Sequence, residues 1–138
     1  MAQESLSRAE LIHRSGIAPE QVDLAIDAGL LIPDRQGLFG QDAVTMLQAA
    51  AVIIAAGVSV DDLARLAVRH ARNVEEVVDE SVDLFLSAMG SQGSEGINLK
   101  ELVPLVEALV PHVVTLVGEH FRRTLLSRAA ARLVEKGQ

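Results

Sequence analysis

The sequence of 138 residues contains no cysteine, no tryptophan and no tyrosine, and it has only three phenylalanines. Without cysteine the chain can form neither disulfides nor zinc–thiolate sites, and it cannot use a thiol as a catalytic nucleophile. Apolar residues make up 49% of the chain and are mostly Ala, Val and Leu, which argues against aromatic-rich β-strands. The composition therefore predicts an all-α protein of one domain, or of one small domain with a helical extension.

Positive charge is also scarce. Twelve Lys and Arg stand against nineteen Asp and Glu, which gives a net charge of −7. An acidic chain repels the phosphate backbone of nucleic acids, so DNA binding would need a local basic patch. The first ten residues, "MAQESLSRAE", lack the apolar stretch of a secretory signal, and we therefore expect a cytoplasmic protein.

One apolar stretch, residues 102–118, raises the question of a membrane span. It reads "LVPLVEALVPHVVTLVG" and includes Glu107, His112 and two prolines. Its length is only about the minimum that crosses a bilayer, and charged residues inside a membrane are costly. We expect a buried or dimer-interface helix and no membrane span.

Capping and turn residues divide the chain into helices. Ser7 and Glu10 have the spacing of a capping box for a helix that ends before Gly16. Pro19 suits the first turn of a second helix that runs to Ala28. The remaining predicted segments are a loop or small hairpin over 30–40, helices over 42–56, 59–73 and 74–89 with or without a break near Asn73, a linker over 89–97, and a helical region from Asn98 onward.

Fixed distances in the first half of the chain agree with one another. Glycines bracket the second helix, a proline follows it, and two further helices come next without a gap. The positions are Gly16-Ile17, Gly29-Leu30-Leu31, Pro33, Phe39, and residues 41–63 with Gly57 and Ser59. With this spacing residues 1–66 resemble a MerR-type winged helix-turn-helix, in which Phe39 stands where the family has a tyrosine. The resemblance makes 1–73 a degenerate MerR-like domain and 74–138 a helical regulatory or dimerisation region; the alternative is one continuous compact domain.

The second helix departs from that family. Asp23, Leu24 and Ala25 stand where the family carries an arginine and aromatic residues, and Gly37 replaces an arginine of the wing. Residues 1–42 hold three Arg against seven Asp and Glu. Phosphate contacts and base reading need cationic or amide donors. We therefore expect a retained scaffold that has lost its DNA-binding surface.

Two longer segments carry a second resemblance: "AGVSVDDLARLA" at residues 56–67 and "GEHFRRTLLSRAAARL" at residues 118–133. With them the chain resembles the helical regulatory domain that precedes the catalytic part of some bacterial adenylate cyclases. The resemblance implies a dimer, control of a cyclase-like catalytic partner domain, and room for a lipid-like ligand such as a fatty acid among the apolar helices.

Residues 99–117 are apolar on more than one side and need cover from other helices, a second subunit or a bound ligand. We expect a homodimer, and an elongated apolar pocket between residues 42–56 and 99–117 that holds a fatty acid. Histidines and arginines near the end of the apolar run would anchor its carboxylate. The predicted ligand-binding residues are Leu109, Val113, His112, His120, Arg122 and Arg123.

Each of these groups also has a plainer interpretation. His112 and His120 form either a pH-sensitive pair or a helix-end histidine beside a solvated one. The C-terminal arginines either bind an anion or simply favour that end of a helix. The apolar helices enclose either a lipid or a dry, fully packed core.

Catalysis and metal binding find no support in the sequence. Adjacent carboxylates, at 61–62 and 75–76, point about 100° apart on a helix and do not converge. The four histidines lack the close spacing of metal ligands, and no nucleophile motif or phosphate loop is present. We expect a non-enzyme with no catalytic residues, no metal site and no cofactor.

Three functions remain open at this stage. The first is a non-catalytic, dimeric regulatory module that controls a partner and binds a lipid. The alternative is a MerR-type DNA-binding transcriptional regulator, and a third is an interaction domain without any ligand. The acidic second helix places the first function ahead of DNA binding.

Overall fold

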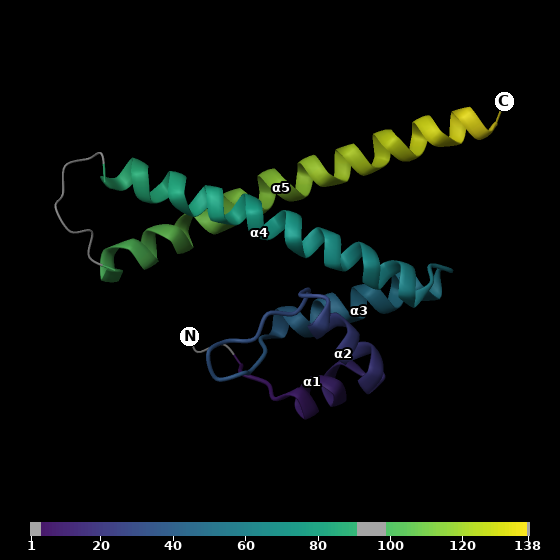
Figure 1. Cartoon of the computed structure of the whole chain (residues 1–138), viewed down its shortest axis with the longest axis horizontal. Coiled ribbons are helices and arrows are strands. Elements are labelled where there is room, and N and C mark those ends of the chain that lie inside the picture. The colour runs from purple at the N-terminus through teal and green to yellow at the C-terminus, as the bar shows by residue number, and fades with distance from the viewer. Residues whose placement is uncertain (1–3, 91–98, 138) are drawn as a thin grey trace. The chain divides into compact units, whose positions relative to one another are not determined.

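The computed structural model describes residues 4–90 and 99–137. In these ranges the chain forms α1 (Arg8–Ser15), α2 (Pro19–Asp27), α3 (Gln41–Ala55), α4 (Val60–Gly90) and α5 (Leu99–Lys136) (Figure 1). The same residues contain no sheet, only an isolated antiparallel bridge between Leu6 and Phe39. The all-α class predicted from the composition is confirmed.

The chain divides into two compact units, Met1–Leu84 and Phe85–Gln138. The division falls inside α4, which continues through Asn73 without the break that the sequence left open. Apolar residues at helical spacing on both sides of Asn73 explain this continuity. The predicted domain boundary after residue 73 stays a prediction, and the predicted linker beyond Gly90 lies outside the described residues.

The first two helices begin as their sequences predict. The Ser7 hydroxyl oxygen accepts a hydrogen bond from the Glu10 amide at 3.1 Å, and a Glu10 carboxylate oxygen accepts one from the Ser7 amide at 3.0 Å. This capping box satisfies two amides that α1 itself leaves unpaired. Gly16, with φ of 72°, ends α1, and Pro19 lies in the first turn of α2.

The next two helix starts differ from each other. Gly40 is the N-cap of α3 and no side chain caps it, so the expectation that the third helix starts at Asp42 is wrong. Asp42 lies in the first turn of α3 instead, where its charge suits the helix dipole. At the start of α4 the Ser59 hydroxyl oxygen accepts from the Asp62 amide at 3.0 Å, which is a regular N-cap.

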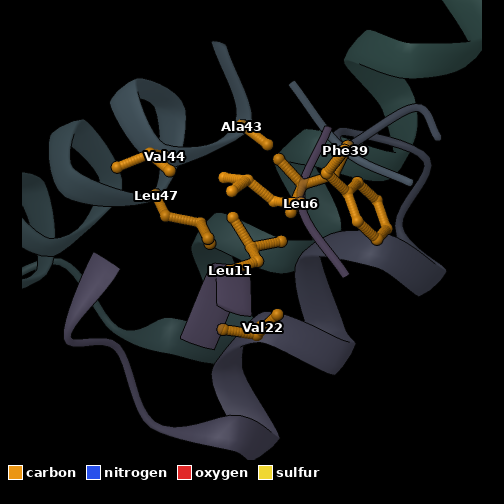
Figure 2. Packing of buried hydrophobic residues seen from close by; sticks show 8 residues of the cluster. Leu6, Leu11, Val22, Phe39, Ala43, Val44 and Leu47 are labelled. Atoms are coloured by element: carbon orange, nitrogen blue, oxygen red, sulfur yellow. The ribbon is translucent and has the colours of Figure 1, made fainter. Parts of the chain in front are cut away.

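The core of the first unit gathers side chains from the segment before α1, from α1, α2 and α3, and from the loop before α3 (Figure 2). Leu11 on α1 and Val22 on α2 have no exposed surface. Full burial of such an aliphatic side chain contributes roughly 1.5–3 kcal/mol. This cluster fixes α2 against its neighbours and consists of Leu6, Leu11, Val22, Leu31, Phe39, Ala43, Val44 and Leu47.

The loop between α2 and α3 is held at both ends. Phe39 is 5% exposed, and its backbone exchanges two hydrogen bonds of 2.7 Å with Leu6. At the loop tip an Asp34 carboxylate oxygen accepts from the amides of Gln36 and Leu38, and Gly37 adopts a φ of 79°. The predicted loop over residues 30–40 is therefore an ordered turn anchored in the core.

Helix α5 forms most of the second unit and runs through Pro104 and Pro111 without interruption. Most of its apolar side chains are exposed, among them Val114 at 62% and Leu116 at 72%. Within the described ranges, no helix is apolar over a stretch long enough to cross a membrane.

Candidate functional site

The outward side of α2 is acidic. Glu20 and Asp27 are exposed, Asp23 is half-buried, and the helix contains no Lys or Arg. Val22, on the inward side, is locked into the core, which fixes the orientation of the helix. A nucleic acid that approached α2 would therefore meet carboxylates where phosphate contacts need cations.

Arg8 reaches this surface from α1, and its guanidinium is hydrogen-bonded to the carboxylate of Asp23. Arg8 donates from Nε to Asp23 Oδ1 at 2.7 Å and from Nη2 to Asp23 Oδ2 at 2.8 Å. This two-pronged geometry is the strong form of an arginine–carboxylate contact. The hydrogen bond from Arg8, followed by its charge, lowers the pKa of Asp23, and the same pair raises the pKa of Arg8.

Residues 1–42 contain two other arginines, Arg14 and Arg35, and their surroundings differ. Arg14 pairs with Glu4, so its charge is also compensated. Arg35 lies at the exposed tip of the loop before α3, and no ion pair is formed by it within the part of the chain that the structure describes. A single uncompensated arginine beside several carboxylates is a weak basis for DNA binding.

A small apolar cavity of about 60 Å³ lies between α2, α3 and the first turns of α4. Its one polar lining residue is Gln21, the only residue of α2 with a base-reading side chain. An engineered cavity that holds benzene has about 150 Å³, and ligand pockets have about 300 Å³ or more. As described, the cavity takes no more than a short alkyl segment. The other lining residues are Ile17, Leu24, Ala25, Ala28, Leu30, Leu47, Ala50, Ala51, Ile54, Val60, Leu63, Ala64 and Ala67.

The close approach of α2 and α4 depends on a glycine. Gly29 follows α2 with a φ of 83°, and a Cβ placed on it would lie 3.3 Å from the Cβ of Ala71 on α4. That separation is tighter than an ordinary contact between carbon atoms. Small residues thus set the distance between the end of α2 and α4, two of the three helices that line the cavity.

Comparison with known protein families gives one match. Residues 4–97, more than half of the chain, match the family described as the Rv1828-like C-terminal domain. The chain belongs to this family. No curated protein matches the sequence.

The match of this Rv1828-like chain spans α1 to α4, and α5 follows it. All six predicted ligand-binding residues lie on α5. At 100° per residue, Leu109, His112, Val113, His120 and Arg123 share one side of that helix, whereas Arg122 points to another. Leu109 is half-buried and the other five are exposed, Val113 at 40%.

The pocket predicted between residues 42–56 and 99–117 stays a prediction. The cavity that the structure describes uses part of the same α3 surface, including Leu47, Ala51 and Ile54, but α2 and α4 supply its other walls. Within the described ranges no three His, Asp or Glu side chains gather closely enough to hold a metal ion.

Sequence reasoning missed the pairing of Arg8 with Asp23. The two residues are fifteen positions apart and lie on different helices, so no local pattern joins them. The available signal was that α1 and α2 form a helix-turn-helix pair, which brings residues of two successive helices near each other. The cavity beside α2 was missed for the same reason, because its walls come from three helices.

Proposed function

We propose that this chain is a non-catalytic regulatory module that acts as a dimer and contacts proteins rather than DNA. Its membership of the Rv1828-like family is compatible with a regulatory module. Rv1828 is itself MerR-like, which supports the resemblance in the first 66 residues. In this proposal the helix-turn-helix is kept as a scaffold, and its exposed surface binds a protein where MerR-type regulators bind DNA.

The acidic α2, with its one nearby arginine tied to Asp23, carries this proposal. The commonest contacts to base edges come from Arg, Lys, Asn and Gln on the exposed side of the recognition helix, and phosphate contacts need cations or donors. Here that side presents Glu20, Asp23 and Asp27, together with Leu24 at 40% exposure. An exposed leucine among carboxylates suits a protein partner with a basic, partly apolar surface.

A second candidate is a MerR-type DNA-binding regulator. The structure retains what that function needs as a scaffold: paired helices α1 and α2, then an ordered loop in the position of the wing. Arg35 at the tip of that loop is exposed. This candidate requires DNA binding that the charge of α2 opposes.

Mobility-shift titration at low salt with mixed-sequence DNA separates the two functions. We expect little binding by the unmodified chain. The double variant Asp23→Arg, Asp27→Arg should bind non-specifically on the order of tenfold more tightly, with an affinity that falls as salt is raised. Replacing Asp23 also releases Arg8, which adds a further cation to the same surface.

The matched control is Asp79→Arg, Asp83→Arg, which makes the same change in net charge on exposed residues of α4. If both double variants gain equally, net charge and not the α2 surface governs binding. Protection of a defined DNA site by the unmodified chain would establish the second candidate and end the first.

Two finer parts of the proposal come from the resemblance to adenylate cyclase regulatory domains: a cyclase-like catalytic partner and a fatty-acid ligand. The cavity beside α2 is too small for a fatty acid as it stands, so binding would require the helices to move apart. Thermal unfolding with oleate tests the ligand. At 100 times its dissociation constant a ligand stabilises the folded chain by about 2.7 kcal/mol, and no shift at saturation would remove the lipid from the proposal.

A further inference from the structure

The apolar cavity beside α2 adjoins two carboxylates of that helix. The walls of the cavity come from α2, α3 and the first turns of α4, all in the first unit, so its volume does not depend on where the second unit lies. Leu24 lines the cavity and is still 40% exposed, which places this side chain at the mouth. At 100° per residue, Glu20, Leu24 and Asp27 fall within an arc of about 60° on α2. The mouth therefore lies beside Glu20 and Asp27, called the acidic edge below.

The carboxylates of the acidic edge have no cation of their own. Both are exposed, and within the part of the chain that the structure describes neither forms an ion pair. Asp23 differs from them, because Arg8 already binds both of its carboxylate oxygens. Cations that approach this side of α2 would therefore meet two uncompensated charges. Opposite charges on two surfaces guide and align their contact, so the acidic edge favours a basic partner.

Gln21 supplies a polar group on the other side of the mouth. It lies about 60° beyond Leu24 around α2, away from the acidic edge. Its side chain is half-buried and lines the cavity, and it forms no side-chain hydrogen bond within residues 4–90 and 99–137. A glutamine amide offers a carbonyl acceptor and N–H donors. These groups match the amide and carbonyl of a polypeptide backbone.

The volume of the cavity limits what can enter it. About 60 Å³ is available, whereas a cavity that holds the six carbons of benzene has about 150 Å³. By proportion the cavity takes about two or three carbons, which is the end of a valine, leucine or isoleucine side chain. An aromatic ring is too large for it.

We propose that the cavity beside α2 is the anchor site for one aliphatic side chain of a basic protein segment. The branched end of that side chain enters past Leu24, and flanking Lys or Arg residues pair with Glu20 and Asp27. The backbone of the segment exchanges a hydrogen bond with the Gln21 amide. The inference rests on the protein partner of the proposed function and names the chemistry of that partner. A fatty acid suits this site less well, because the acidic edge repels its carboxylate.

Titration of the full chain with three capped peptides, followed by nuclear magnetic resonance, tests the anchor site. Each peptide has one central residue, which is leucine, alanine or phenylalanine, with arginines on both sides. The leucine peptide should shift the methyl signals of Leu24 and Leu63 and the side-chain amide signals of Gln21, all at the cavity. The methyl signals of Leu11, which is buried in the core, should stay unchanged.

The other two peptides measure how well the cavity selects its occupant. The alanine peptide should bind on the order of thirtyfold more weakly than the leucine peptide, because two or three buried carbons are lost. The phenylalanine peptide should also bind more weakly, because a ring overfills the cavity. This comparison uses the unmodified chain, so it does not depend on how any variant folds.

Charge reversal tests the acidic edge separately. The double variant Glu20→Lys, Asp27→Lys should bind the leucine peptide about tenfold more weakly, because two attractive contacts become repulsive. Its unfolding midpoint should stay close to that of the unmodified chain, since both side chains are exposed. The matched control is Asp79→Lys, Asp83→Lys, which makes the same change in net charge on α4 and should weaken binding by less than about threefold.

The outcomes separate this inference from the proposed function. Equal binding of the leucine and alanine peptides, or equal weakening by both double variants, would mean non-specific attraction to an acidic chain and overturns the anchor site. Unchanged cavity signals at millimolar leucine peptide also overturn it, and a shift of those signals on dilution of the chain alone would make a second copy the occupant. None of these results decides between protein and DNA contact, which the mobility-shift titration measures independently.

Discussion

Replacing Gly29 with alanine tests the close approach of α2 and α4. The substitution adds one Cβ at a position where two separate costs arise. The residue keeps a φ of 83°, which an L-residue adopts reluctantly, and its new Cβ would lie 3.3 Å from the Cβ of Ala71. Gly37 is a matched control, because its φ of 79° is nearly the same and no heavy atom lies within 4 Å of its added Cβ.

The expected magnitudes follow from these two environments. A left-handed backbone destabilises an L-residue in the folded state by about 1–2 kcal/mol. Alanine also lowers the entropy of the unfolded chain relative to glycine, which stabilises the folded state by about 0.4–1 kcal/mol. Gly37→Ala should therefore lose about 1 kcal/mol of unfolding free energy. Gly29→Ala should lose about 2 kcal/mol, because α4 or the end of α2 must also shift by a few tenths of an ångström.

Urea unfolding of the full chain, followed by circular dichroism, measures both losses through the transition midpoint at unchanged slope. A third variant, Ala71→Gly, removes the opposing Cβ at a cost of about 1 kcal/mol in helix propensity. In that background Gly29→Ala should cost less than it does in the natural chain. This coupling isolates the contact between the two positions.

Equal losses for Gly29→Ala and Gly37→Ala, with no coupling to Ala71→Gly, would refute the reasoning. That result would mean that Gly29 and Ala71 on α4 are far enough apart to admit a methyl group, and that only the backbone conformation matters at Gly29.

Two further predictions concern the first unit. Leu11→Ala should destabilise the first unit by about 2–5 kcal/mol, because Leu11 is fully buried at the centre of its core. The control is Leu133→Ala on α5, where the side chain is exposed, and it should change the unfolding free energy of the first unit by no more than about 0.5 kcal/mol. Stability should also fall in acid. Hydrogen bonds lower the pKa of three carboxyl groups: Glu10 through Ser7, Asp23 through Arg8, and Asp62 through Ser59. The stability that these carboxylates contribute is present above the ordinary carboxyl pKa of about 4 and is lost as the pH falls below it. Urea midpoints measured at pH 7, 5 and 3 should decrease mainly between the last two, and Asp62→Asn should reduce that decrease; a midpoint independent of pH would contradict the assignment.

Local chemistry made the helices of the first unit predictable. The Ser7–Glu10 capping box, Pro19 at a helix start and Ser59 as an N-cap each act within four residues, so the sequence shows them directly. The start of α3 was misplaced because Gly40 caps it without a side chain. Asp42, which has the right residue type for a cap, lies two positions too late.

The candidate site was less predictable, because its contacts join distant positions. The acidic character of α2 is visible in the sequence, but the engagement of Arg8 by Asp23 depends on how α1 and α2 pack. The cavity beside α2 depends on the small residues of three helices, and its 60 Å³ reflect a packing detail that composition does not encode. The elongated space that the scarcity of aromatic residues suggested lies between residues 42–56 and 99–117, and it stays a prediction.

The buried side of α2 and two of its outward carboxylates differ in what they contribute to stability. Val22 is completely buried and Ala28 is 8% exposed, so substitutions there would disturb the fold. Glu20 and Asp27 lie on the opposite side in water, where a substitution typically changes stability by no more than about 0.5 kcal/mol. The charge at Glu20 and Asp27 can therefore change at almost no cost in stability, whereas Asp23 contributes to stability through its pair with Arg8. Fold resemblance to MerR-type regulators therefore does not establish DNA binding by this chain, and the mobility-shift titration of the α2 variants tests it.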